Sequence, residues 1–366
     1  MESRRRGVLD RRGIVLLVTL VATMLGWIAF RRWEARRVSP AHEATALARR
    51  PFESLPAGAV VVAEFDLAAL RSHPVTRDWL REPRMVEGLG NIGVLCGADP
   101  LDRVERLAVA IPSANDAGFG LVASGAPQPE AARCAEQVIE RRGGTPARDV
   151  REGFTLVRDS RAPDGAMLAV GPRGLLLLAE PSYLTEIMHV VASPSSGGDA
   201  RHAALRAAVG PGAVVVSVAL TSELRATLND ELTKQHIASS PFTTLDGGAA
   251  ALALGERLGF RALLAFGDAD SATAARELIR AQLQSQGTTP LARLVGYASM
   301  LERVEVSTRG SAVELEADLA VEEFLGALRR LVTLQRLASQ PAPSGPSSAV
   351  SPAPSAAPDA PRVPAN

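Results

Sequence analysis

An internal repeat constrains the fold of this chain more than any other feature of its sequence. The run GAVVVAEFDLAALR at 58–71 aligns without a gap to GAVVVSVALTSELR at 212–225. Farther along, the Gly-Phe runs at 118–123 and 259–265 also match. Each copy then enters a helical pattern that ends at a glycine, Gly143 or Gly287. A unit that occurs twice along the chain predicts two copies of one fold.

The pattern within each copy reads strand, helix, strand, strand, helix, strand, strand, helix. The end of the second copy is the clearest part, because apolar and polar residues alternate over 303–307 and 313–319 across an Arg309-Gly310 turn. This period of two indicates a hairpin with one solvated face. Such sheets are antiparallel and carry helices on the other face. We therefore expect an α+β fold of two tandem antiparallel-sheet-plus-helix units, one at 51–209 and one at 210–338.

An uncharged apolar segment precedes the repeat. Residues 13–30 read GIVLLVTLVATMLGWIAF. As a helix this segment spans about 27 Å, close to the ~30 Å hydrocarbon core of a bilayer. A cleaved signal peptide is the alternative, but its hydrophobic region is usually only about 7–15 residues long and ends at small residues. The segment predicts an uncleaved signal-anchor, a single-pass transmembrane helix that contacts the lipid bilayer.

The segments around this span indicate orientation and order. Five arginines lie in the basic tail at 1–12, and four follow the span closely, at 31–37, in the juxtamembrane linker at 31–50. This small excess favours a cytoplasmic N-terminus, with the body outside the inner membrane as a periplasmic domain. The tail at 339–366 is rich in Pro, Ala and Ser. Such a composition buries too little apolar surface to fold, so we expect it to be disordered.

The opening of the body carries a resemblance. Leu55-Pro56-Ala57-Gly58 is followed by VVVAEFDLAAL. This stretch of about 20 residues resembles the opening of membrane-anchored bacterial envelope proteins whose bodies begin with Leu-Pro, a β-strand and Asp-Leu. The resemblance implies an envelope location. It implies no activity, cofactor or site residue.

A Gly-x-Gly-x-x-Gly run lies at 88–93. Binding of a dinucleotide at such a run requires a buried strand before it and a helix after it, so that the helix N-terminus meets the pyrophosphate. The residues upstream, REPR at 81–84, do not read as a buried strand, and CGADP at 96–100 does not read as a helix. We therefore expect a flexible Gly-rich loop and no bound nucleotide.

Cys96 and Cys134 are the only cysteines in the chain. They can pair in an oxidising compartment, and the closed loop of about 39 residues would then stabilise the fold by roughly 3.5–4 kcal/mol. The alternative is that Cys134 is a free core residue, because it lies on the apolar stripe of a helical pattern with Ala131, Ala135 and Val138. The sequence leaves both readings open.

Other catalytic and ligand-binding patterns are missing from the sequence. The five histidines do not occur at metal-ligand spacing, and we expect surface or cap positions for each. There is no Gly-x-Ser-x-Gly elbow. The run that begins at Asp268 lacks the Gly and Glu of a calcium loop and reads as a helix N-cap at Asp270 or Ser271. We predict no catalytic residue, cofactor or metal.

Three acidic residues share one side of the last strand. Glu314, Glu316 and Asp318 occupy alternate positions, about 7 Å apart along the strand. They read either as a solvated sheet face, with Arg303 softening their repulsion across the hairpin, or as a docking face for a basic partner. We consider the second reading because the Arg-rich linker of a neighbouring chain would be one such partner.

Charge and aromatic content narrow the classes of function that the chain can have. The chain has 40 basic and 40 acidic residues and 4% aromatics, which disfavours a nucleic-acid partner. We expect a non-catalytic, membrane-anchored envelope protein that binds or scaffolds another envelope component. The alternatives are a hydrolase with a site between the two copies and a carrier of lipid or small molecules.

Overall fold

The computed structural model describes most of the chain between residues 51 and 330. The described ranges are 51–81, 85–86, 88–112, 118–126, 128–171, 174–192, 198–234, 240–327 and 329–330. The predicted transmembrane span at 13–30, the segments at 1–12 and 31–50 and the tail at 339–366 lie outside the described residues. Among the helices that the structure describes, none is long and apolar enough to cross a membrane.

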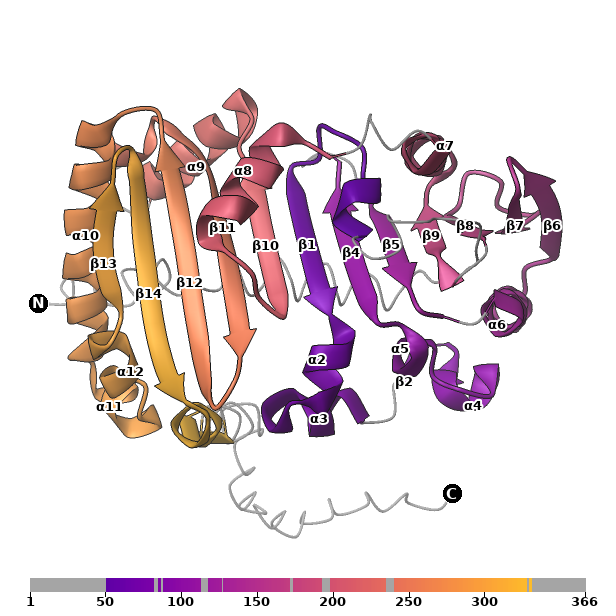
Figure 1. The fold of residues 1–366 in the computed structure, drawn as a ribbon, viewed down its shortest axis with the longest axis horizontal. Coiled ribbons are helices and arrows are strands. Elements are labelled where there is room, and N and C mark those ends of the chain that lie inside the picture. Colours follow the sequence, from indigo (N-terminus) through magenta and orange to yellow (C-terminus); the bar gives the residue numbers. More distant parts are fainter. Residues whose placement is uncertain are drawn as a thin grey trace, which may run out of the picture.

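One antiparallel sheet of 12 strands organises the fold (Figure 1). Its order is β13-β14-β12-β11-β10-β1-β4-β5-β9-β8-β7-β6. The strands are β1 (Val61–Asp66), β4 (Arg106–Ile111), β5 (Gly120–Ser124), β6 (Pro146–Arg151), β7 (Phe154–Asp159), β8 (Met167–Val170), β9 (Leu176–Ala179), β10 (Val214–Ala219), β11 (Leu245–Leu254), β12 (Arg257–Phe266), β13 (Glu305–Arg309) and β14 (Ala312–Ala320).

Helices connect and cover these strands, and a separate small hairpin consists of β2 (Met85–Val86) and β3 (Gly90–Asn91). The helices are η3 (Pro51–Ser54), α2 (Leu67–Ser72), α3 (Pro74–Arg81), α4 (Ile92–Cys96), α5 (Pro100–Arg103), α6 (Gln128–Arg141), α7 (Pro181–Ala192), α8 (Ala200–Val209), α9 (Ser222–Lys234), η6 (Ser240–Phe242), α10 (Ala269–Gly287), α11 (Pro290–Val295) and α12 (Ala298–Glu302). A further helical stretch follows β14 at 321–327.

The expected architecture of two tandem units is wrong. The fold is α+β and antiparallel, but a single sheet runs through both halves of the chain without interruption. The physical reason is that β1 and β10, the opening strands of the two halves, pair with each other and so remove two exposed edges. Outward from this seam, the strands are β1, β4, β5, β9, β8 on one side and β10, β11, β12, β14, β13 on the other. The first half adds the hairpin β6–β7 at its outer end.

The paired stretch of β1 and β10 is centred on Ala63 and Val216, with two residue pairs on either side. Superposing the two strands about this central pair gives an offset of 216 − 63 = 153 residues. The gap-free sequence alignment implies 212 − 58 = 154. Because side chains alternate between the two faces of a strand, this one-residue difference decides which residues of the halves share a face.

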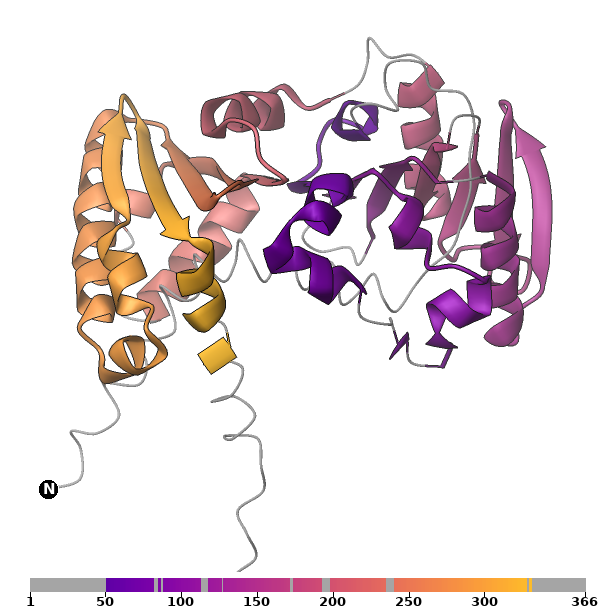
Figure 2. The same ribbon diagram turned by 60° about the horizontal axis from the view of Figure 1, so that its bottom comes forward.

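From β1 to β7, the first half of the sheet is buried on both faces, which corrects the expectation of one solvated face. One face packs against α2, α5 and α6 through Leu67, Leu101 and Ala135. The other packs against α7 through Leu184 and Ile187. Figure 2 shows helices on both sides of this half.

The second half of the sheet also has helices on both faces. Helix α10 packs on one face through Ala272 and Ala275. Helix α8 lies on the other and buries Leu205 and Val209 against β10, β11 and β12. Helix α8 precedes the predicted boundary at 209/210 in the chain, yet it packs on strands that follow it. The predicted boundaries therefore do not separate two packing units, although the superposition of the halves remains a prediction.

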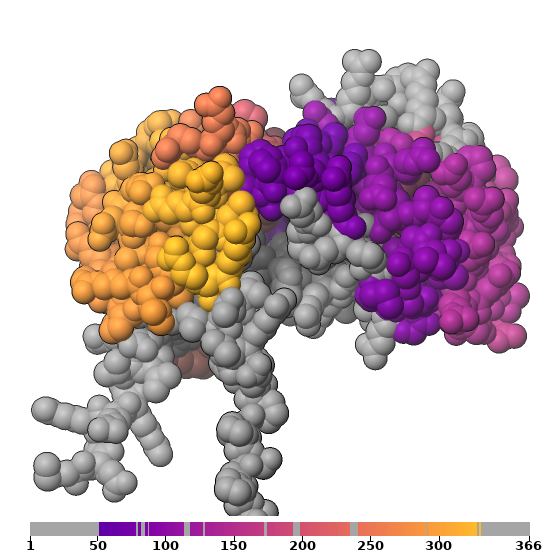
Figure 3. Space-filling view, turned by 90° about the horizontal axis from the view of Figure 1, so that it is seen from below, coloured from indigo at the N-terminus to yellow at the C-terminus, as the bar shows by residue number. Residues whose placement is uncertain are grey.

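The halves also meet beside α2 and α3. Nε2 of His73, the residue that ends α2, lies 3.0 Å from the carbonyl oxygen of Gly255 in the β11–β12 turn. Figure 3 shows the indigo surface of the first half against the orange and yellow surface of the second. This contact supplements the β1–β10 seam.

Candidate functional site

A group of polar side chains is buried where α8 crosses the β1–β10 seam. We call Glu64, Asp199, His202, Arg206 and Ser217 the seam cluster. Asp199 is the N-cap of α8, His202 and Arg206 lie one turn apart on that helix, Glu64 lies on β1 and Ser217 on β10. His202 and Ser217 are 0% exposed. Buried polar groups of this kind need partners. Here the partners come from within the cluster, from Arg201 and from the backbone at 58–59, whereas Nη1 of Arg206 has no hydrogen-bond partner among the described residues.

The bonds of His202 fix its tautomer. Nε2 lies 2.8 Å from the carbonyl oxygen of Ala59, and Nδ1 lies 2.8 Å from the Ser217 hydroxyl oxygen. A carbonyl oxygen only accepts, so Nε2 carries the hydrogen and donates it. In the neutral ring Nδ1 then accepts from the Ser217 hydroxyl. Burial lowers the pKa of His202, against the opposing effects of the Ala59 carbonyl and the nearby Asp199 carboxylate.

Two ion pairs complete the seam cluster. Arg206 pairs with Glu64 across the seam, and its guanidinium lies 4.3 Å from the centre of the Phe52 ring. Asp199 pairs with Arg201 at 2.9 Å and also accepts from the N–H of Gly58 at 3.1 Å. The Arg201 side chain, with the N–H groups of Arg201 and Gly58, holds the pKa of the Asp199 carboxyl well below its usual range.

In the Ser217–His202 pair the hydroxyl donates its hydrogen bond to an imidazole nitrogen, as an activated serine nucleophile does. A substrate would need to reach the hydroxyl, however, and neither side chain is exposed. The other ring nitrogen donates to a backbone carbonyl rather than to a carboxylate. The arrangement therefore satisfies buried polar groups and joins α8 to both halves of the sheet.

An open hollow lies beside the N-terminus of α7, with a volume of about 320 Å³. We call it the α7 hollow. It is lined by Ala57, Gly58, Pro112, Gly118, Phe119, Glu180, Ser182, Tyr183 and Glu186. Two of these residues carry carboxylates and none carries a basic side chain. The local charge of the α7 hollow therefore favours a cationic group.

Tyr183 lies in the wall of the α7 hollow and is 9% exposed. Its ring occupies the space that a side chain at Gly120 would fill. Its hydroxyl is buried and has no hydrogen-bond partner. Burial, with a smaller effect from the Glu186 carboxylate, raises the pKa of Tyr183. A buried phenol without a hydrogen-bond partner costs free energy in the folded chain.

The structure joins Cys96 and Cys134 as a disulfide. Cys96 ends α4, and Cys134 lies on α6. Both sulfurs lie in an apolar cluster with Val86, Ile92 and Val138. The bridge therefore fixes the segment of short elements between β1 and β4 to the long helix α6.

The acidic row at Glu314, Glu316 and Asp318 is paired within the chain. Glu314 meets Arg309 at 3.2 Å, Glu316 meets Arg261 at 3.3 Å, and Asp318 meets Arg257 at 2.8 Å. These three arginines, and not Arg303, offset the repulsion among the three carboxylates. The row is thus a ladder of opposite charges, and docking of a basic partner on it remains a prediction.

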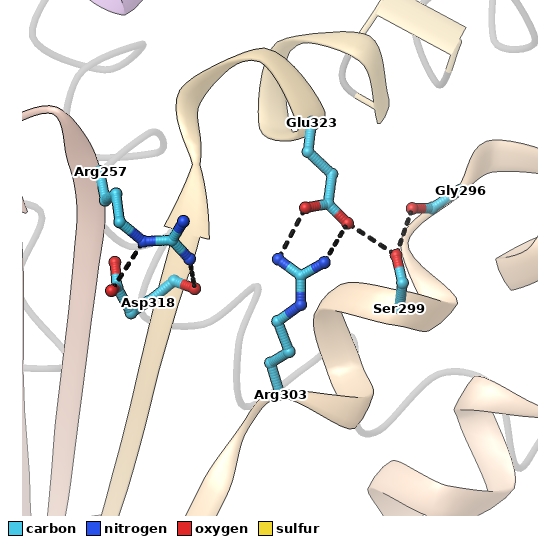
Figure 4. A network of polar contacts seen from close by, with 6 residues as sticks. All are labelled: Arg257, Gly296, Ser299, Arg303, Asp318 and Glu323. Atoms are coloured by element: carbon cyan, nitrogen blue, oxygen red, sulfur yellow. Dashed lines mark hydrogen bonds and ion pairs between the residues drawn. The ribbon is translucent and has the colours of Figure 1, made fainter.

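Arg303 belongs to a separate network (Figure 4). Its guanidinium holds Glu323 by two bonds of 2.7 and 3.1 Å. Ser299 donates to the same carboxylate at 2.8 Å. This network ties α12 to the helical stretch at 321–327.

Two other expectations are corrected. The Gly-x-Gly-x-x-Gly run is a hairpin edge followed by the five-residue helix α4, because Asn91 Oδ1 accepts from Gly93 and Val94 and caps that helix. The N-cap of α10 is Asp268, which accepts from the N–H of Ser271. Among the described residues no three His, Cys, Asp or Glu side chains are grouped to hold a metal.

The seam cluster was not foreseen, since His202 was expected at the surface. One signal was available. Ser217 interrupts a run of valines on a strand that reads as buried, and a buried hydroxyl needs a partner. Sequence alone did not show that His202 would be this partner, because the two lie on different elements.

Comparisons with known proteins add little. No family model matches the chain. No curated protein matches it. A solved structure described as crystal form I of TP0453 aligns with a TM-score of 0.44 and 13% identity, over 77% of this chain and 97% of that one. A similarity of this size carries no argument about fold or function.

Proposed function

We propose that this chain is a non-catalytic protein of the cell envelope that binds another envelope component by seating a basic group in the α7 hollow. The observation that carries the proposal is the lining of that hollow. It combines the carboxylates of Glu180 and Glu186 with no basic side chain among the lining residues. A lysine or arginine side chain would pair with these carboxylates.

The disulfide supports the location. Disulfides persist in oxidising compartments such as the periplasm and are rare in a reducing cytosol. A body that contains the Cys96–Cys134 bridge is suited to the outer side of the inner membrane. This argument is independent of the arginine count on either side of residues 13–30.

In-cell photocrosslinking of the full chain tests the proposal. A photoreactive amino acid at the exposed position Ser182, in the rim of the α7 hollow, should give a discrete crosslinked partner. The double variant Glu180→Gln/Glu186→Gln should lose this product, and raised salt should weaken it.

The matched control is Glu302→Gln/Glu305→Gln, which removes two exposed carboxylates far from the α7 hollow in the sequence. It should keep the product. If the crosslinked product persists in the first variant with unchanged yield, the α7 hollow is not where the partner binds.

A further inference from the structure

Strand β6 forms one end of the sheet. It pairs with β7, and within the described part of the chain no strand lies on its other side. Figures 1 and 2 show it at the right-hand extreme of the molecule. Val150 on this strand is 72% exposed, although it is apolar. An exposed edge with an apolar side chain is a template for strand pairing.

The turn between β6 and β7 determines which backbone N–H and C=O groups of β6 point away from β7. Glu152 and Gly153 have φ of 51° and 78°, and they form a two-residue turn of type I′. Such a turn makes Arg151 and Phe154 a hydrogen-bonded pair. The backbone groups then alternate, so those of Arg148 and Val150 point away from β7. Consistent with this, the N–H of Val150 bonds to its neighbour Asp149, whose Oδ1 lies 2.8 Å away.

We propose that β6 pairs antiparallel with β6 of a second copy of this chain, with Val150 opposite Val150. Outward-pointing groups face each other when such a symmetric pair is centred on Arg148, on Val150 or on Asp149 between them. A centre on Asp149 sets two aspartates directly opposite each other, which is destabilising, and this leaves the registers centred on Arg148 or on Val150. The first sets Arg148 against Arg148. The second sets Asp149 against Arg151 twice, and opposite charges directly across a pair of strands are stabilising.

The side chains on the edge fit this register. Asp149 and Arg151 form no ion pair with any described residue. Arg148 is held away by Glu136 on α6, with one bond of 2.7 Å. In the single copy the Asp149 carboxylate accepts a hydrogen bond from the N–H of Val150. Pairing exchanges this bond for a backbone bond to the second copy, and the carboxylate then meets Arg151 of that copy.

Disulfide trapping tests the register in the full-length chain. Both native cysteines are already bonded, so Val150→Cys introduces a single free thiol. In the proposed pair its two Cα atoms are about 5.5 Å apart, within the range that a disulfide bridges. Mild oxidation should give a covalent dimer. Ala147→Cys is the control, because its two copies would be about 20 Å apart in this register. Equal crosslinking of both variants, or of neither, overturns the proposal.

Charge exchange tests the pairing itself by sedimentation over a range of concentration. Asp149→Arg and Arg151→Asp should each raise the dimer dissociation constant about tenfold, because each creates two like-charge pairs. An equimolar mixture of the two variants should regain the wild-type constant, since every mixed pair is again complementary. A wild-type chain that stays monomeric throughout, or a mixture that does not recover, overturns the proposal.

Discussion

His202 and Ser217 are joined by a hydrogen bond of 2.8 Å that connects helix α8 to strand β10 with no exposed surface on either side chain. Because Nε2 of the same ring donates to Ala59, one imidazole ties together a helix, a strand of the second half and the segment that leads into the first. The consequences for stability and for chemistry can be measured separately.

Stability should fall as the pH is lowered through about 6.5, the usual pKa of an exposed histidine. The pKa of His202 is lowered in the folded chain, so below pH 6.5 the unfolded chain binds a proton that the folded chain does not. The free energy of unfolding then decreases with a slope of at most about 1.4 kcal/mol per pH unit. Urea titrations between pH 7 and 5 measure this slope. His202→Gln should flatten it, and an unchanged slope would assign the effect to another group.

Ser217 should be unreactive in the native protein. A fluorophosphonate probe needs access to a serine hydroxyl, and this one is 0% exposed. We therefore expect no labelling at Ser217 by mass spectrometry under native conditions. Ser217→Ala should cost roughly 1–3 kcal/mol of stability, because it leaves the buried Nδ1 of His202 without a donor. Stoichiometric labelling of Ser217 in the native chain would instead favour the hydrolase alternative.

The Glu64–Arg206 pair should be strongly coupled. Both side chains are largely buried, at 17% and 14% exposed. Removing one partner leaves the other charge without compensation, so Glu64→Gln or Arg206→Met should each cost about 3 kcal/mol. The double variant should cost clearly less than the sum of the two. Thermal or urea unfolding of all four proteins provides the cycle, and additive costs would show that the pair does not interact.

The disulfide should stabilise the first half. Opening a loop with a sequence separation of 38 costs about 4 kcal/mol in the chain-entropy model. The double variant Cys96→Ala/Cys134→Ala also loses two sulfurs from an apolar cluster. We expect a clear drop in Tm for the variant and for the reduced wild type. Unchanged unfolding after reduction would mean that the native chain lacks this bridge.

The sequence predicts secondary structure well where a short hydrophobic alternation or a short repeated run identifies the element. The Gly-Phe runs align at 259 − 118 = 141 residues. The structure places Leu121 and Ala262 in matching positions outward from the seam, with the same offset of 262 − 121 = 141. The alternation around Glu314 likewise identifies a real hairpin. The alternation depends on residues close in the chain, and the Gly-Phe match depends on short runs of similar sequence.

The sequence did not predict which strands far apart in the chain pair with each other in the sheet. Nothing in the alternation of β1 indicates that its neighbour is β10, 153 residues away, rather than a strand of its own copy. The seam cluster depends on this pairing, because Glu64 reaches Arg206 only when α8 crosses both strands. The α7 hollow is similar, since Gly118 and Glu180 meet only after β5 pairs with β9.

The symmetric register about Ala63 and Val216 has a further meaning. Two identical chains that dimerise through one strand adopt such a register across a twofold axis. If the two halves superpose as predicted, the molecule corresponds to a dimer whose subunits share one polypeptide, with α8 lying across the junction. In a fused dimer the two subunits are free to diverge. The first half carries the disulfide, the α7 hollow and the β6 edge, whereas the second carries the paired charge ladder.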